Sequence, residues 1–142
     1  MAVVVFDADV LIAYLGRDDP HHAGAVERMR QALEPGVRRL VSAVNYTEVL
    51  VGPLAAAGRA GAETVEAMLV RFGIETVPVD MDLARRAAAV RVRTKLELPD
   101  AYAVATAVHA EQRWLDAVRL ESFDEKVAKA YADLRPLSTE LP

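Results

Sequence analysis

The chain has 142 residues, of which 53% are hydrophobic and 27% charged, and its formal net charge is −4 at pH 7. This length and composition predict a single globular domain over residues 1–142 rather than a disordered chain. The absence of cysteine excludes disulfides, cysteine-ligated zinc and thiol catalysis. No apolar run approaches the roughly 20 residues that cross a bilayer, and no signal-peptide pattern is present, so we expect no membrane contact and a cytoplasmic location.

Short apolar segments and amphipathic segments alternate along the chain. In chain order, we expect a strand over 3–6, helices over 10–15 and 18–33, a strand over 39–42, helices over 43–54 and 58–71, a strand over 74–79, helices over 80–95 and 100–112, a strand over 117–120, a helix over 124–131 and a strand over 134–137. Strands separated by helices of this length predict an α/β fold, a three-layer α/β/α sandwich around a mainly parallel sheet.

Capping signals assign local roles to several polar residues. Asp9 is better placed than Asp7 to cap the helix over 10–15, which leaves Asp7 in need of another role. Asn45 and Glu48 have the spacing of a capping box, with Asn45 as the N-cap. Gly61 is expected to weaken its helix, because glycine is a poor helix former.

Four of the 21 acidic residues lie beside buried elements. Asp7 ends the first strand, Glu48 is surrounded by apolar residues, Asp100 opens a largely apolar helix, and Asp124 follows the fourth expected strand. Each of them alone could be a capping or first-turn acid. Together they would repel one another unless a cation neutralised them, and carboxylate ligands favour Mg²⁺ or Mn²⁺. Ligands of such folds bind at the carboxyl ends of the strands, where these acids are expected.

The segments FDADVLIAYL, NYTEVLVG, LPDAYAVATA and ESFDEKVAK, in this order, resemble the PIN domain and in particular the short VapC-type toxins of toxin–antitoxin (VapBC) pairs. The resemblance implies that Asp7, Glu48, Asp100 and Asp124 bind the metal, with Asp7 and Asp100 as the firmest ligands, and that Ser122 takes a small-hydroxyl position. It implies a Mg²⁺- or Mn²⁺-dependent endoribonuclease that cleaves RNA phosphodiester bonds with metal-activated water. It also implies a homodimer, and a hetero-oligomer with a cognate VapB-type antitoxin that fills the acidic groove.

The chain departs from the family pattern at Asp9, where members usually have Asn, Ser or Thr. We interpret Asp9 and Ser122 as residues that support the ligands without being primary ligands themselves. Arg91 and Arg93 are candidates for contacts with RNA phosphates, although a solvated helix face explains them equally well. Asp116 precedes the fourth expected strand and is a weaker candidate for the site.

Other functions fit parts of the pattern. FDADVL resembles the D-x-D opening of haloacid-dehalogenase-type phosphatases, with Asp7 as nucleophile and Asp9 as general acid, but the later acidic pair of that family is missing. A phospho-acceptor receiver domain would need a lysine after the last strand, and the late lysines are misplaced for it. A non-catalytic interaction domain with a PIN fold would not need all four acids. We therefore expect metal-dependent RNA cleavage.

Overall fold

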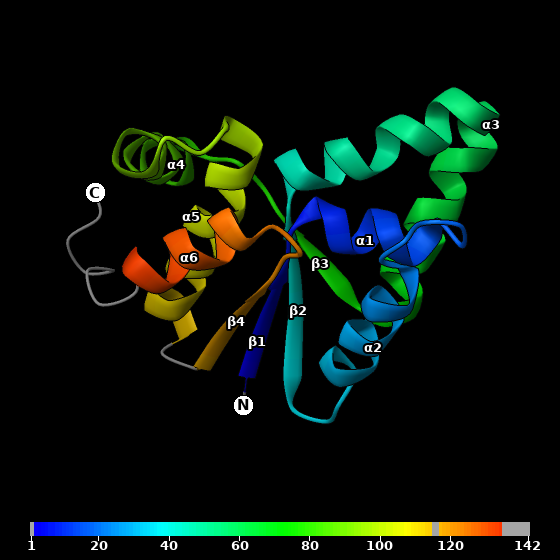
Figure 1. Cartoon of the computed structure of the whole chain (residues 1–142), viewed down its shortest axis with the longest axis horizontal. Coiled ribbons are helices and arrows are strands. Elements are labelled where there is room, and N and C mark those ends of the chain that lie inside the picture. Colours follow the sequence, from blue (N-terminus) through cyan, green and yellow to red (C-terminus); the bar gives the residue numbers. More distant parts are fainter. Residues whose placement is uncertain (1, 115–116, 135–142) are drawn as a thin grey trace.

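A parallel four-stranded sheet forms the centre of the computed structural model, which describes residues 2–114 and 117–134 (Figure 1). The elements in chain order are β1 (Ala2–Phe6), α1 (Ala8–Leu15), α2 (His22–Ala32), β2 (Val37–Ser42), α3 (Ala43–Phe72), β3 (Ile74–Val77), α4 (Met81–Thr94), α5 (Leu98–Trp114), β4 (Ala117–Glu121) and α6 (Glu125–Leu134). The strand order is β3-β2-β1-β4, and β1 pairs in parallel with both β2 and β4. Parallel neighbours need crossover connections, which the helices supply.

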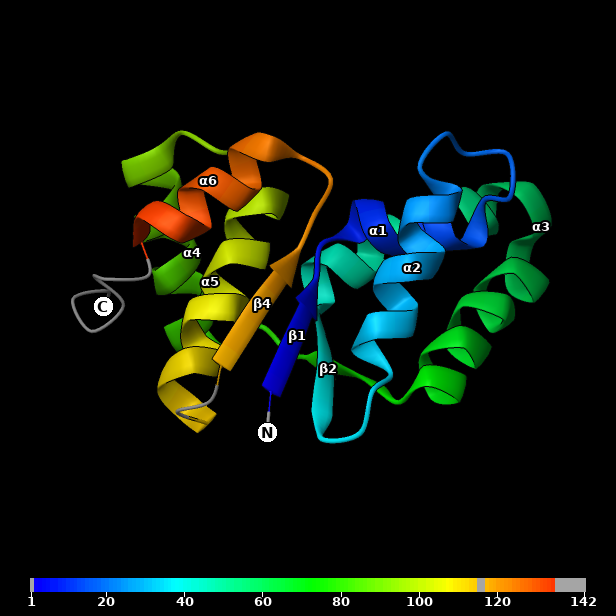
Figure 2. The same cartoon turned by 60° about the horizontal axis from the view of Figure 1, so that its bottom comes forward.

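Helices cover both faces of the sheet, as Figures 1 and 2 show. Val3 and Val5 of β1 belong to the core under α4, α5 and α6. Val4 and Phe6 belong to the core under α1, α2 and α3. All four side chains are 0% exposed, which explains why β1 is continuously apolar instead of alternating. The predicted three-layer α/β/α sandwich with a parallel sheet is confirmed.

The long helix α3 consists of two helical halves joined at Gly58, which has a φ of 58° and a ψ of −135°. This conformation favours glycine, because a side chain at positive φ is strained. The turn brings Gly61 so close to Pro53 that a Cβ atom at position 61 would overlap the Pro53 carbonyl. Gly61 therefore has a packing role that the sequence does not predict, since its missing side chain allows the two halves to meet.

This contact predicts opposite effects for two glycines of the same helix. Gly61→Ala is expected to lower the free energy of unfolding by about 1–3 kcal/mol, because a backbone carbonyl cannot move aside cheaply. Gly52 has no atom within 4 Å of its Cβ position, so Gly52→Ala is expected to raise the free energy of unfolding by about 0.5–1 kcal/mol. Urea unfolding followed by circular dichroism measures both. Equal effects of the two substitutions would contradict the close contact.

Some predicted boundaries differ from the observed elements. α2 begins at His22 and not at residue 18, because the Asp19 carboxylate accepts a hydrogen bond from the His21 amide in a turn before the helix. The strand predicted over 134–137 is wrong at Leu134, which ends α6, and its other residues lie outside the described ones. Apart from the junction within α3, the other ends coincide with the predicted ones or shift by one to three residues, as helix and strand ends commonly do.

Candidate active site

Two acids with a serine follow neighbouring strands at one end of the sheet. Asp7 comes directly after β1, while Ser122 and Asp124 come after β4. From β1 the chain proceeds outward to β2 and β3, then returns to place β4 on the other side of β1. The crevice between β1 and β4 is therefore the topological switch point, where parallel α/β proteins bind their ligands. Glu48 in α3 and Asp100 in the first turn of α5 complete the predicted set of acids.

Asp7, and not Asp9, caps the first helix. Asp7 is the N-cap of α1: its Oδ1 accepts a hydrogen bond from the Ala8 amide at 2.8 Å. Its Oδ2 accepts a hydrogen bond from Ser122 Oγ at 2.9 Å, and the side chain is buried. Asp9 lies in the first turn, where its Oδ2 accepts a hydrogen bond from the Phe123 amide at 2.9 Å. The prediction that Asp9 caps the helix is wrong.

Ser122 connects the ends of β1 and β4. Its hydroxyl donates to Asp7 and accepts a hydrogen bond from the Asp124 amide at 3.1 Å. Asp124 is exposed, and its Oδ1 accepts a hydrogen bond from the Lys126 amide at 2.9 Å at the start of α6. Asp124 therefore stabilises the first turn of its helix as well as contributing charge at this end of the sheet.

Asn45 holds Glu48 in place and is not the N-cap that the sequence predicts. Ser42 caps α3, since its Oγ accepts a hydrogen bond from the Asn45 amide at 3.1 Å. The fully buried Asn45 side chain donates to Glu48 Oε1 at 2.9 Å and to the Pro99 carbonyl at 3.0 Å. One amide group thus joins α3 to the residue that precedes Asp100, and so sets the spacing of two candidate acids.

Burial and mutual repulsion perturb Asp7 strongly. The pKa of Asp7 is raised from 3.8 to about 7, chiefly by burial and then by the charges of Asp9 and Asp100. The hydrogen bonds from Ser122 and the Ala8 amide oppose this shift. Burial also raises the pKa of Asp9. A carboxylate in this position carries negative charge that the surrounding protein does not neutralise.

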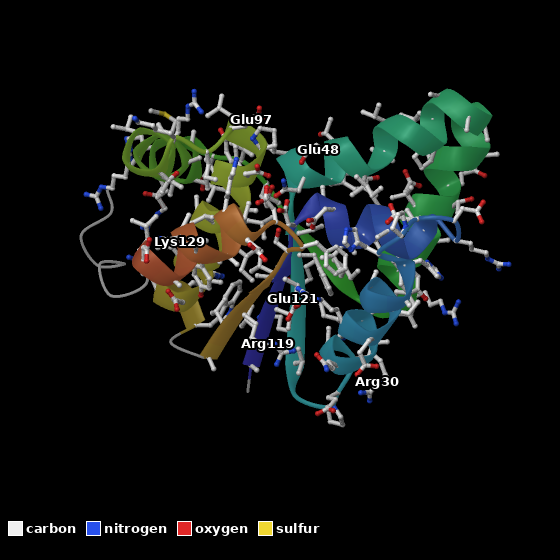
Figure 3. All side chains as sticks on the ribbon, in the orientation of Figure 1. Arg30, Glu48, Glu97, Arg119, Glu121 and Lys129 are labelled. Carbon is white, nitrogen blue, oxygen red and sulfur yellow. The ribbon has the colours of Figure 1, made fainter. Side chains whose placement is uncertain are left out.

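Asp100 lies among several acidic side chains. Its pKa is raised from 3.8 to about 6 by burial, and then by the charges of Asp124, Glu48, Glu97 and Asp9. Figure 3 shows Glu48 and Glu97 at the same end of the sheet, the first on α3 and the second just before α5. Sequence reasoning missed Glu97, although its position three residues before Asp100 was a usable signal.

The acidic residues fit a divalent cation in their chemistry. As they stand, no three acidic or histidine side chains within residues 2–114 and 117–134 are close enough to hold a metal ion. However, Oδ1 of Asp9 is buried and has no hydrogen-bond partner among the described residues, and the pKa values of Asp7 and Asp100 are raised by burial and then by neighbouring charge. Oxygen donors with unneutralised charge are suited to Mg²⁺ or Mn²⁺.

Arg28 of α2 supports the loop that carries Ser122. Its Nη1 donates to Glu121 Oε2 at 2.9 Å and to the Ser122 carbonyl at 3.0 Å. Its guanidinium lies 4.6 Å from the centre of the Phe123 ring, on which His21 stacks at 4.7 Å. No local signal identifies Arg28, because Ser122 is 94 residues away in the chain.

The two arginines proposed for phosphate contact differ in their surroundings. Arg91 donates from Nη1 to the carbonyls of Lys95 at 2.9 Å and of Leu96 at 2.7 Å, and so stabilises the end of α4. Arg93 is exposed and lines a cleft of about 830 Å³ beside the acids. Asp116 lies outside the described residues.

The fold and the site define a parallel α/β protein with an acidic centre at the switch point of its sheet. The sequence pattern of the PIN domain family matches residues 4–134. The chain belongs to the PIN domain family. A comparison with curated protein sequences gave no match. Within the described residues, no helix is long and apolar enough to cross a bilayer.

Several solved structures are similar to this chain. The Mycobacterium tuberculosis toxin VapC20, described as cleaving the sarcin-ricin loop, has a TM-score of 0.70 and 19% identity, with 89% of this chain and 94% of that chain covered. VapBC-1 from nontypeable Haemophilus influenzae has a TM-score of 0.68 and 15% identity, with coverages of 92% and 93%. A toxin–antitoxin complex from Klebsiella pneumoniae has a TM-score of 0.59 and 26% identity, with coverages of 85% and 86%. The first two likenesses concern the fold alone.

Proposed function

We propose that this chain is a Mg²⁺- or Mn²⁺-dependent endoribonuclease, acting as a single nuclease domain, and the toxin of a toxin–antitoxin pair. The observation that carries this proposal is the buried carboxylate of Asp7, which Ser122 holds beside Asp100 at the switch point of a PIN domain. Two similar structures, one described as a sarcin-ricin loop cleaving toxin and the other as a toxin–antitoxin complex, support the same activity.

The acidic side chains would have different roles in binding the cation. Asp7 and Asp100 hold the divalent cation, with Glu48 and Asp124 completing its surroundings directly or through water. A bound divalent cation supplies a Lewis acid for the phosphate and lowers the pKa of a water molecule. Because the pKa of Asp7 is about 7, its carboxyl group must release a proton as the cation binds near neutral pH.

The residues behind these ligands position them. The Ser122 hydroxyl orients Asp7, and the Asn45 amide orients Glu48. Asp9 binds the Phe123 amide, which holds the loop after β4 against α1. In this arrangement Asp9 anchors the loop and adds negative charge to the site, whereas the phosphatase alternative would require it to act as a general acid.

Removal of the metal tests the proposed function. Purified protein is expected to cleave single-stranded RNA in Mg²⁺ or Mn²⁺, to stop in EDTA and to recover in excess metal, with products followed by gel electrophoresis. Cleavage that continues undiminished in EDTA would contradict a metal-dependent mechanism. Turnover of p-nitrophenyl phosphate that is lost in Asp9→Asn would favour the phosphatase instead.

An apolar groove beside Glu48 supports the antitoxin part of the proposal. The groove has a volume of about 370 Å³ and is lined by Ile12, Leu15, Val51 and Pro53 together with Glu48. Ile12 is 42% exposed and Val51 is 61% exposed, so both offer apolar surface to a partner. An antitoxin segment with apolar residues and a basic side chain would fit here. A homodimer is part of the same proposal.

A further inference from the structure

The cleft beside the acids extends along α6. Lys126, Lys129, Ala130 and Asp133 line it, and their spacing of three or four residues places them on one face of the helix. The segment 93–97, which comprises the end of α4 and the residues that lead into α5, forms the other wall. The cleft begins at Asp124, just before α6, and follows this helix. Because ten helical residues extend about 15 Å, the outer end of the cleft lies well away from the acids.

Every lysine of the chain lines this cleft. The sequence has three lysines, at positions 95, 126 and 129, and Arg93 joins them there. Lys129 forms an ion pair with Asp133 at 2.8 Å. Arg93, Lys95 and Lys126 are exposed, and none of them forms an ion pair with another described residue. Three positive charges are therefore available to a ligand.

The backbone at Lys95 gives a second reason to assign a ligand to the cleft. Lys95 ends α4 with a φ of 63°, and no other non-glycine residue of the described chain has positive φ. Glycine is the usual residue at such a position, because a side chain there is strained. A strained lysine facing an open cleft, which both basic and acidic side chains line, is more consistent with a binding role than with a stabilising one.

We propose that the cleft binds the sugar–phosphate backbone of the RNA strand on one side of the cleaved phosphate, which rests on the proposed ribonuclease function. With that phosphate at Asp100 and Asp124, the strand continues between α6 and segment 93–97, where Lys126, Lys95 and Arg93 contact successive phosphates. These contacts are independent of base sequence, so they hold the strand and leave sequence choice to other residues. An acidic peptide fits less well, since the proposed metal site at the inner end would act on a phosphodiester and not on a peptide.

The salt dependence of RNA binding tests this inference. Binding of a fluorescein-labelled single-stranded RNA of mixed sequence is measured by anisotropy in EDTA, at several salt concentrations. The variants are Lys126→Ala, Lys95→Gly and the combination of both. Lys95→Gly also relieves the backbone strain at position 95. The slope of log K against log salt is expected to become shallower by about 0.7 for each cation removed. Arg59→Ala is the matched control, because α3 lies across the sheet from α6 (Figure 1) and Arg59 is exposed.

The outcomes separate this inference from the proposed function. If wild-type protein cleaves RNA in Mg²⁺ and the lysine variants bind RNA like the Arg59→Ala control, the inference about the cleft is wrong, while the proposed ribonuclease function stands. Wild-type protein that neither cleaves nor binds RNA would overturn both. A labelled polyglutamate that binds as tightly as RNA, and weakens equally in the lysine variants, would assign the cleft to an acidic protein partner instead.

Discussion

Asp100→Asn is expected to reduce RNA cleavage on the order of 10³-fold, because it removes several kcal/mol of stabilisation that a carboxylate-held cation gives the transition state. Asparagine has nearly the same size as aspartate, and Asp100 is only partly buried, so the packing of α5 should survive. Circular dichroism and thermal unfolding check the fold, and the rate of RNA cleavage in Mg²⁺ measures the effect.

Asp82 provides a closely matched control for this substitution. It is also an acid in the first turn of a helix, α4, but it forms an ion pair with Arg86 at 2.9 Å. Asp82→Asn is expected to leave cleavage within about twofold of wild type, because Asp82 is not among the acids whose charges act on Asp100. If Asp100→Asn cleaves RNA at the wild-type rate, the site assignment is wrong.

Asp7 is expected to make the metal-free protein less stable as the pH rises. The unfolded carboxyl group titrates near 3.8, whereas the folded one titrates near 7. The folded state therefore holds a proton that the unfolded state releases, and the stability present below about pH 4 is lost as the pH rises through 7. Between about pH 5 and pH 8, wild-type protein in EDTA should lose on the order of 2–3 kcal/mol through this group.

Asp7→Asn should remove most of that loss. The amide oxygen can still cap α1, while the charge that requires protonation is absent. Urea unfolding in EDTA at several pH values measures the difference in stability between wild-type protein and Asp7→Asn. Asp100 titrates in both proteins, so its contribution cancels in this difference. Excess Mg²⁺ at about pH 8 should stabilise wild-type protein more than Asp7→Asn, because a cation bound to the folded state shifts the equilibrium.

A control and a contrary result complete this experiment. The pKa of Asp82 is lowered by its hydrogen bond with Arg86, so Asp82→Asn should not alter the pH dependence above about pH 5. If wild-type protein and Asp7→Asn lose stability in parallel between about pH 5 and pH 8, the buried charge of Asp7 is not the cause.

Much of the fold is predictable from local patterns, because they record burial. The apolar residues of β1 predict a strand covered on both faces, and the small residues of α5 predict a buried helix. The helix predicted over 80–95 begins within one residue of that place, where Asp80 caps it, since a capping interaction involves neighbours in sequence. The metal-binding roles of Asp7, Glu48, Asp100 and Asp124 stay predictions.

Hydrogen bonds between distant residues explain where sequence reasoning failed. Asp9 was assigned as a cap because the residue that occupies its carboxylate, Phe123, lies 114 positions away. For Asn45 the cause is partly local, since Ser42 takes the cap three positions before it, and partly distant, since the Asn45 side chain donates to the Pro99 carbonyl 54 positions away. A sequence pattern indicates which polar groups need hydrogen-bond partners, but it does not indicate which distant residue provides the partner.

By itself, the sequence determined the element types, the parallel α/β class and the set of acids that needs explanation, because burial and capping leave local traces. Tertiary structure decided that Asp7, rather than Asp9, begins α1 and binds Ser122. It also decided that lysines separated by more than 30 positions line one cleft beside the acids. Both results depend on β4 returning beside β1, a long-range pairing that no local sequence preference specifies.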